Sequence, residues 1–187
     1  KEAQESTLAS GQVIEYKKLI LSTGSKPVVP TFIKGYEMEN IYPIQKNQEY
    51  LNALHEKVEK AEKIAVVGGG FIGVEIAEQI KLSGNEGVLV EVAEKCLWTA
   101  FDEEFSSEVE TLMTDMGIVL RTGRKVMEFV GDGKVEALLL DNGEKIPADL
   151  VILGMGARPN TDLAESMGIE LNKRKAIVVD EYMRTSD

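Results

Sequence analysis

The chain has 187 residues, a formal net charge of −11 and 43% hydrophobic residues. This length and composition suit a globular protein with one well-cored domain, or one domain and a fragment, and they exclude a disordered chain. The acidic balance argues against a nucleic-acid surface and against binding to anionic membranes. No run of about 18 apolar residues occurs, so no transmembrane helix is expected.

The few cysteine and histidine residues restrict the chemistry further. The single cysteine, Cys96, excludes an internal disulfide and fits a reducing compartment, so we expect a cytoplasmic protein. Cys96 has no histidine nearby, which favours a structural cysteine over a reactive thiol. The single histidine, His55, excludes a His-rich metal site, and no CxxC, HExxH or P-loop pattern occurs. We therefore expect no metal.

Four segments precede the first clear motif. An apolar run at residues 19–21 predicts a strand, and Thr23 and Gly24 then turn the chain. Residues 31–47 lack a periodic pattern and are predicted to form an irregular linker. Residues 48–62 carry apolar side chains at helical spacing, which predicts a helix.

A β-α-β pattern occupies the centre of the chain. The β-branched run at residues 64–67 predicts a buried parallel strand, and residues 74–82 predict a helix. The apolar run at residues 88–90 predicts a second strand. A glycine turn joins the first strand to the helix, and an acidic residue closes the second strand. This order is typical of a dinucleotide-binding unit.

The glycines of the turn have the spacing G-x-G-x-x-G, at Gly68, Gly70 and Gly73. Gly68 allows a tight turn, Gly70 lets the backbone approach a pyrophosphate, and Gly73 lets the helix lie close to the strand. The free N–H groups and the positive end of the helix dipole then face the phosphates. Glu91 can accept hydrogen bonds from both hydroxyls of an adenosine ribose. The alternative is a glycine turn in an ordinary α/β core.

The following residues predict a helix, a strand and a hairpin region. Residues 101–116 have an acidic first turn and an apolar face, which indicates a helix, and residues 118–120 predict a further parallel strand. Turn signals separate three short apolar runs, which predict a three-stranded antiparallel meander. These runs are residues 125–130, 135–140 and 144–146.

A glycine-rich loop follows the next predicted strand, residues 150–153, and includes Gly154 and Gly156. Since parallel strands present ligands at their carboxyl ends, this loop is expected at the same edge of the sheet as the glycine turn. Residues 161–167 predict a short helix, and residues 177–179 predict another strand.

Five segments, taken together, resemble the NAD(H)-binding domain of the FAD-dependent pyridine nucleotide-disulfide oxidoreductases, and they lie in the order and at the spacing of that family. They are LILSTGSKPVVP (residues 19–30), VVGGGFIGVEIAE (66–78), FDEEF (101–105), ADLVILGMGARPNT (148–161) and IVVDEYMRTSD (177–187). We therefore expect an α/β, Rossmann-like three-layer domain with a parallel central sheet and a three-stranded antiparallel meander.

The resemblance also implies a division of the chain. Residues 1–35 are similar to a remnant of the FAD-binding domain, residues 36–178 to the NAD(H)-binding domain, and residues 179–187 to the start of the return to the FAD domain. The sequence is thus expected to be a fragment, inactive alone. Its partners would be a dinucleotide and the rest of its own FAD and dimerisation domains, in a homodimeric parent.

Site residues are carried over from the family by position. Phe71 stands where the family often has a tyrosine that shields the flavin, with helix–strand packing as the alternative. Glu75 matches an acid near the nicotinamide, with a solvated helix acid as the alternative. Glu91 would favour NADH over NADPH, with Lys95 as the nearby cation. The expected cofactor-binding residues are Thr23, Gly24, Gly68, Gly69, Gly70, Phe71, Ile72, Gly73, Glu75, Glu91, Gly154 and Gly156.

The implied function is hydride transfer from NADH to FAD, with no acid, base or nucleophile required from this chain. Electrons would then pass to a disulfide, a sulfenic acid or oxygen. The FDEEF and GSKPVVP segments resemble the NADH oxidase and coenzyme A-disulfide reductase branch more than the ferredoxin-reductase branch. Two alternatives stay open, a ferredoxin- or rubredoxin-type reductase and a non-catalytic NAD(H)-sensing module.

Overall fold

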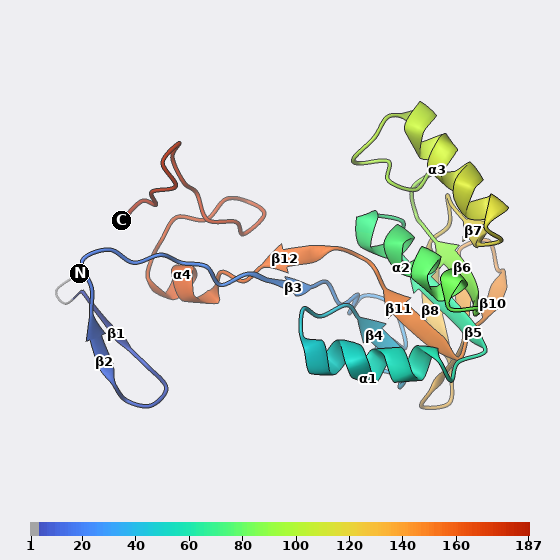
Figure 1. Ribbon diagram of the computed structural model, residues 1–187, viewed down its shortest axis with the longest axis horizontal. Coiled ribbons are helices and arrows are strands. Elements are labelled where there is room, and N and C mark those ends of the chain that lie inside the picture. Colours follow the sequence, from blue (N-terminus) through green and yellow to red (C-terminus); the bar gives the residue numbers. More distant parts are fainter. Residues whose placement is uncertain (1–3) are drawn as a thin grey trace. The chain divides into compact units, whose positions relative to one another are not determined.

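The computed structural model describes residues 4–187 of the chain (Figure 1). The chain forms two compact units, one made of the residues up to Ser25 together with Pro159–Asp187, the other of Lys26–Arg158. No helix among the described residues is long and apolar enough to cross a membrane. The expected division into FAD-related and NAD(H)-related segments stays a prediction.

A five-stranded sheet forms the centre of the larger unit, and every neighbouring pair of its strands is parallel. The central strand β5 lies between β11 and β6, so that Val66 pairs with Ile152 on one side and Leu89 on the other. In spatial order the strands are β4 (Ile41–Pro43), β11 (Leu150–Leu153), β5 (Lys63–Val67), β6 (Glu86–Val90) and β7 (Val119–Arg121).

Side chains of successive residues along these strands enter two different cores, because a strand turns alternate side chains to opposite faces. On β5, Ile64 and Val66 pack with residues of the helices, including Ala77 and Met113. Ala65 belongs to the second core, together with residues of an antiparallel meander. The sheet is therefore covered on both faces, which explains its uninterrupted apolar runs.

The expected three layers are confirmed. Helices α1 (Gln48–Val58), α2 (Phe71–Leu82) and α3 (Glu103–Asp115) contribute the residues that pack on one face of the sheet. The meander packs on the other face, with Phe129 and Leu138 fully buried. Its strands are β8 (Val126–Gly131), β9 (Val135–Leu140) and β10 (Lys145–Pro147), in the order β10-β9-β8.

The three helices of the larger unit differ at their N-termini. Asn47 caps α1 by accepting the N–H of Tyr50 at 2.9 Å, and Asp102 caps α3 by accepting the N–H of Phe105 at 3.2 Å. Helix α2 has Gly70 at its N-cap and no side-chain hydrogen bond there. The first turn of α2 thus keeps the N–H groups that a capping side chain would otherwise engage.

The smaller unit has little regular structure. Strands β1 (Glu5–Thr7) and β2 (Val13–Glu15) form an antiparallel hairpin, and α4 (Asp162–Ser166) is a short helix. Strand β3 (Ser25–Pro27) pairs with β12 (Ala157–Pro159), and most of both strands belongs to the larger unit.

Three predicted elements differ from the structure. Residues 19–21 form no strand, and Ile20 is 87% exposed, since no strand among the described residues lies beside this apolar run. Residues 177–179 form only a single bridge, between Ile177 and Leu171. Within the predicted irregular linker, Ile41–Pro43 forms strand β4, because β11 offers it a parallel partner.

Candidate functional site

Three glycines bring the end of β5, the start of α2 and the end of β11 into direct backbone contact. A Cβ on Gly73 would overlap the carbonyl oxygen of Gly68, and one on Gly154 would lie 2.8 Å from the Cα of Gly73. Gly68 has a φ of +108°, which favours glycine. The expected tight turn at Gly68 and close helix–strand approach at Gly73 are therefore confirmed.

Gly70 differs from these glycines because a side chain there would meet no atom within 4 Å. Its φ of −76° is open to any residue, so neither packing nor backbone conformation requires glycine. Free space in front of an uncapped helix N-terminus is what an anionic group needs in order to reach the N–H groups. The glycine turn is thus packed tightly behind and open in front.

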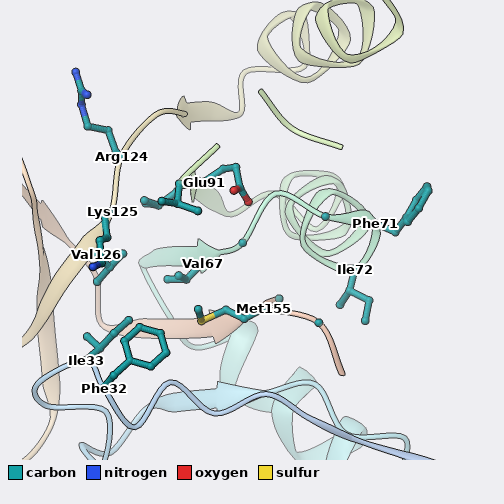
Figure 2. Close-up of a pocket in the computed structure, with 16 residues that line it drawn as sticks. Phe32, Ile33, Val67, Phe71, Ile72, Glu91, Arg124, Lys125, Val126 and Met155 are labelled. Atoms are coloured by element: carbon teal, nitrogen blue, oxygen red, sulfur yellow. The ribbon is translucent and has the colours of Figure 1, made fainter. Parts of the chain in front are cut away.

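A cavity of about 470 Å³ lies at the carboxyl ends of β5, β6 and β11. It extends from the loop after β11, across the glycine turn, to the end of β6 and the segment before β8 (Figure 2). Apolar side chains form much of its wall, among them Ile33, Val67 and Met155. Expected site residues that line it are Gly68, Gly70, Phe71, Ile72, Glu91, Gly154 and Gly156.

Glu91 is bonded to the glycine turn. Its carboxylate accepts the backbone N–H of Gly69 and, through its other oxygen, the N–H of Ala93 at 2.7 Å. A Cβ on Gly69 would lie 2.9 Å from the Glu91 side chain, so glycine is needed there for the approach. Because each carboxylate oxygen has a second lone pair, Glu91 keeps acceptor capacity for a ligand.

Phe71 lies at the mouth of the cavity and is 61% exposed. Its ring contacts Phe101 edge to face at a centroid distance of 5.8 Å, and Phe101 contacts Phe105 at 6.3 Å. In Figure 2 the ring points away from Val67. Phe71 thus starts an aromatic row toward α3, and its role at a flavin stays a prediction.

The other expected residues lie outside the cavity wall. Gly69 and Gly73 support the turn from behind, and Glu75 is exposed on α2. Thr23 and Gly24 belong to the smaller unit, where the Thr23 hydroxyl donates to the carbonyl of Asn160. Their contact with a cofactor stays a prediction.

Cys96 is fully buried in the helix-side core, and its N–H donates to Glu110 Oε1 at 2.8 Å. Burial raises the pKa of the thiol to about 12, with a smaller contribution from the carboxylates of Glu110 and Glu91. The thiol is therefore protonated at neutral pH, and a structural role is favoured over a reactive one. Among residues 4–187 no group of three or more His, Cys, Asp or Glu could hold a metal.

Two cations in the cavity wall, Arg124 and Lys125, were not expected from the sequence. The N–H of Arg124 donates to the carbonyl of Glu91 at 3.0 Å, which places the two residues side by side. Lys95, the cation expected here, instead donates to Ser107 Oγ at 2.8 Å and does not line the cavity. The sequence signal for Arg124 and Lys125 was the T-G-R-K run after β7. The carboxyl end of this parallel strand must lie at the same edge of the sheet as the glycine turn.

The arrangement fits an extended ligand with an anionic centre. An uncapped helix N-terminus and the open position at Gly70 could receive a diphosphate. On one side Glu91 offers acceptors to sugar hydroxyls. On the other side Gly154 and Gly156 have no side chains, which leaves room for a flat ring beside this loop. No side chain in the wall has the partners of an acid–base or nucleophilic pair.

Sequence comparison places the whole chain in one family, since the model for pyridine nucleotide-disulphide oxidoreductases matches residues 1–187. An NADH oxidase of Streptococcus pneumoniae is 40% identical over 185 residues, which cover 91% of this chain and 40% of that protein. Putidaredoxin reductase of Pseudomonas putida is 30% identical over 191 residues, covering 100% of this chain and 45% of that one. The chain thus spans less than half the length of these relatives.

Solved structures agree. A ferredoxin reductase from Rhodopseudomonas palustris superposes with a TM-score of 0.92 at 28% identity, covering 100% of this chain and 45% of that one. The water-forming NADH oxidase of Lactobacillus brevis, solved with NADH, gives a TM-score of 0.83 at 31% identity, covering 94% of this chain and 38% of that one. From the full-length family match, the shared fold and the glycine turn, this chain belongs to the pyridine nucleotide-disulphide oxidoreductase family.

Proposed function

We propose that the Lys26–Arg158 unit binds NAD(H) in the cavity at the carboxyl ends of β5, β6 and β11, and that the full-length protein uses it to present NADH to FAD. The observation that carries this proposal is the contrast within the turn. Gly68 and Gly73 are required by packing, whereas Gly70 faces open space beside an uncapped helix. A glycine turn with only a packing role would give no reason for Gly70.

The diphosphate would lie against Gly70 and the first turn of α2. The N–H groups there have no capping side chain, and the helix dipole adds partial positive charge. A diphosphate carries the negative charge and the acceptor oxygens that such a site lacks. The buried contact between Gly68 and Gly154 holds the turn in place, so binding need not order it.

Glu91 would accept hydrogen bonds from the adenosine ribose. The N–H groups of Gly69 and Ala93 orient its carboxylate before any ligand arrives. A sugar with free 2′ and 3′ hydroxyls can donate to the remaining lone pairs, whereas a 2′-phosphate adds a like charge. Glu91 therefore favours NADH over NADPH.

The nicotinamide end would lie near Gly154 and Gly156. The Gly156 carbonyl accepts the N–H of Val28 at 3.0 Å, which holds this loop, and Met155 and Ile72 provide apolar walls that exclude water. When both cofactors are bound, NADH supplies the hydride and the flavin of FAD accepts it. The chain's own residues bind and orient, and none is needed as an acid or base.

In the full-length protein, residues 1–35 and 179–187 would belong to the FAD-binding part, and the rest of that part and a dimerisation domain would complete a homodimer. The electrons would pass to a disulfide, a sulfenic acid or oxygen, and the similarity to proteins named NADH oxidase supports this branch. A ferredoxin- or rubredoxin-type reductase is the second candidate, because the R. palustris ferredoxin reductase superposes over the whole chain. A non-catalytic NAD(H)-sensing module is the third.

Calorimetric titration of the chain with NADH tests the binding proposal. We expect saturable binding that Glu91→Ala weakens, while Glu78→Ala, an exposed change on α2 outside the cavity wall, leaves it unchanged. No binding at millimolar NADH would overturn the proposal. Steady-state NADH oxidation by the full-length protein, with oxygen, a disulfide or an iron–sulfur protein as acceptor, separates the three functional candidates.

A further inference from the structure

We propose that Arg124 determines how well this site accepts a 2′-phosphorylated coenzyme, so that NADPH as well as NADH is bound. This inference rests on the proposed dinucleotide function. It concerns the adenosine end of the cavity, where Arg124 lies next to Glu91. The inference is based on the position of Arg124, on the negative charge around Glu91, and on the partners that neighbouring cations already have.

Main-chain hydrogen bonds fix the position of Arg124. Its N–H donates to the carbonyl of Glu91 at 3.0 Å, and the N–H of Gly123 donates to the carbonyl of Ala93 at 2.7 Å. The segment before β8 is therefore bonded to the residues that follow β6. Any ribose held by the Glu91 carboxylate lies within the range of a long side chain at position 124.

Two carboxylates lie at or near this end of the cavity. Glu91 is in the wall, and Glu94 lies behind it, where its carboxylate is so close to Gly123 that a Cβ there would be 3.0 Å from it. A 2′-phosphate placed among these groups would be repelled unless a cation offset them. The N–H bonds to Glu91 reduce this repulsion but do not remove the charge.

Two other cations nearby are engaged elsewhere, whereas Lys125 lines the cavity beside Arg124. Arg121 Nε donates to Glu144 Oε1 at 2.8 Å, and this bond is the main cause that lowers the pKa of Glu144. Lys95 donates to Ser107 and lies 3.9 Å from Glu110, on the side of α3. These two cations are therefore not available to a ligand in the cavity.

Arg124 itself is exposed, and its Nη1 donates to the carbonyl of Gly123 at 2.9 Å. Figure 2 shows its guanidinium directed away from Val67 and Glu91, so contact with a phosphate requires rotation about the side-chain bonds. Such rotation is open to an exposed arginine. The remaining N–H groups form a planar fork that matches two phosphate oxygens.

The test compares ADP-ribose with 2′-phospho-ADP-ribose, which differ by the one phosphate in question, and then NADH with NADPH, by calorimetric titration of the whole chain. We expect Arg124→Ala to weaken 2′-phospho-ADP-ribose and NADPH by about fivefold, while ADP-ribose and NADH change less than about twofold. Arg124→Lys keeps the charge without the fork and should restore part of the loss. High salt should shrink the effect.

Controls separate the possible explanations. Arg174→Ala removes an exposed arginine from the smaller unit and should change neither ligand pair. Equal losses for ADP-ribose and 2′-phospho-ADP-ribose, no loss, or the same selective loss in Lys125→Ala without one in Arg124→Ala would overturn the inference. Wild-type chain that binds ADP-ribose but not 2′-phospho-ADP-ribose would also overturn it, whereas binding of neither would overturn the proposed function itself.

Discussion

The carboxylate of Glu91 accepts the backbone N–H of Gly69, so the acid that ends β6 is bonded to the turn that ends β5. A side chain at Gly69 would collide with Glu91, which makes the glycine between the two motif glycines as necessary as its neighbours. Together with the bond from the Gly68 N–H to the carbonyl of Val90 at 2.8 Å, this hydrogen bond holds the proposed diphosphate position and the proposed ribose position in a fixed relation.

Replacing Glu91 by alanine should reduce both stability and coenzyme binding. The N–H groups of Gly69 and Ala93 lose their acceptors, which should lower the free energy of unfolding by about 1–3 kcal/mol. Urea denaturation measures this change, and Glu78→Ala on the exposed face of α2 is the matched control. An unchanged unfolding midpoint would show that water replaces the carboxylate at no cost.

Gly70 and Gly73 should respond differently to an added side chain. A Cβ at Gly70 meets no atom within 4 Å, so in Gly70→Val the melting temperature should hold while NADH binding is lost. Gly73→Ala places a Cβ on the Gly68 carbonyl and should destabilise the fold by several kcal/mol. Differential scanning calorimetry with NADH titration measures both. Full NADH affinity in Gly70→Val would remove the diphosphate from this position.

Cys96 should make stability fall at alkaline pH. Its pKa is raised from 9.0 to about 12 by burial, so the unfolded chain loses the thiol proton at a pH where the folded chain keeps it. The stabilisation is complete below about pH 9 and is lost as the pH rises toward about 12, by up to about 1.4 kcal/mol per pH unit. Urea denaturation at about five pH values from pH 8 upward should show that the free energy of unfolding declines more steeply in the wild type than in Cys96→Ala. Parallel curves would contradict this.

Ser106 should be replaceable by alanine without loss. It is fully buried on α3, and its hydroxyl has no hydrogen-bond partner in the structure. Removing an unsatisfied buried hydroxyl and adding a better helix former should keep or raise the free energy of unfolding by up to about 1 kcal/mol. The adjacent Ser107→Ala serves as the contrast, because Ser107 donates to Glu103 and accepts from Lys95. A large loss in Ser106→Ala would reveal a partner for the hydroxyl.

The layers of the larger unit could be predicted from local patterns. Uninterrupted apolar runs such as residues 64–67 indicated strands covered on both faces, and turn signals indicated the meander. Strand β4 was not predicted, because Ile41–Pro43 is only three residues long and includes a proline. This segment becomes a strand only beside β11. The strand predicted at residues 19–21 was wrong for the opposite reason. Its pattern is apolar, but no partner strand lies beside it.

At the site, the sequence indicated residues whose spacing carries the information, such as Gly68, Gly73 and Glu91. It indicated Arg124 only indirectly, through the T-G-R-K run after a neighbouring strand, because the hydrogen bond from Arg124 to Glu91 joins residues that only the parallel crossover brings together. Lys95 was expected beside the ribose because it is close to Glu91 along the chain. Its side chain instead turns toward α3, which sequence proximity does not show.

The bare main-chain contact among Gly68, Gly73 and Gly154 has a consequence for motion. The turn has no hinge of its own, since opening it would part β5, β11 and α2 at once. The hydrogen-bonded amides of Gly68 and Gly154 should accordingly exchange with deuterium only when the whole unit unfolds, whereas the uncapped N–H groups at the start of α2 should exchange freely. The glycine turn would then keep its conformation up to the melting transition and unfold together with the sheet in a single step.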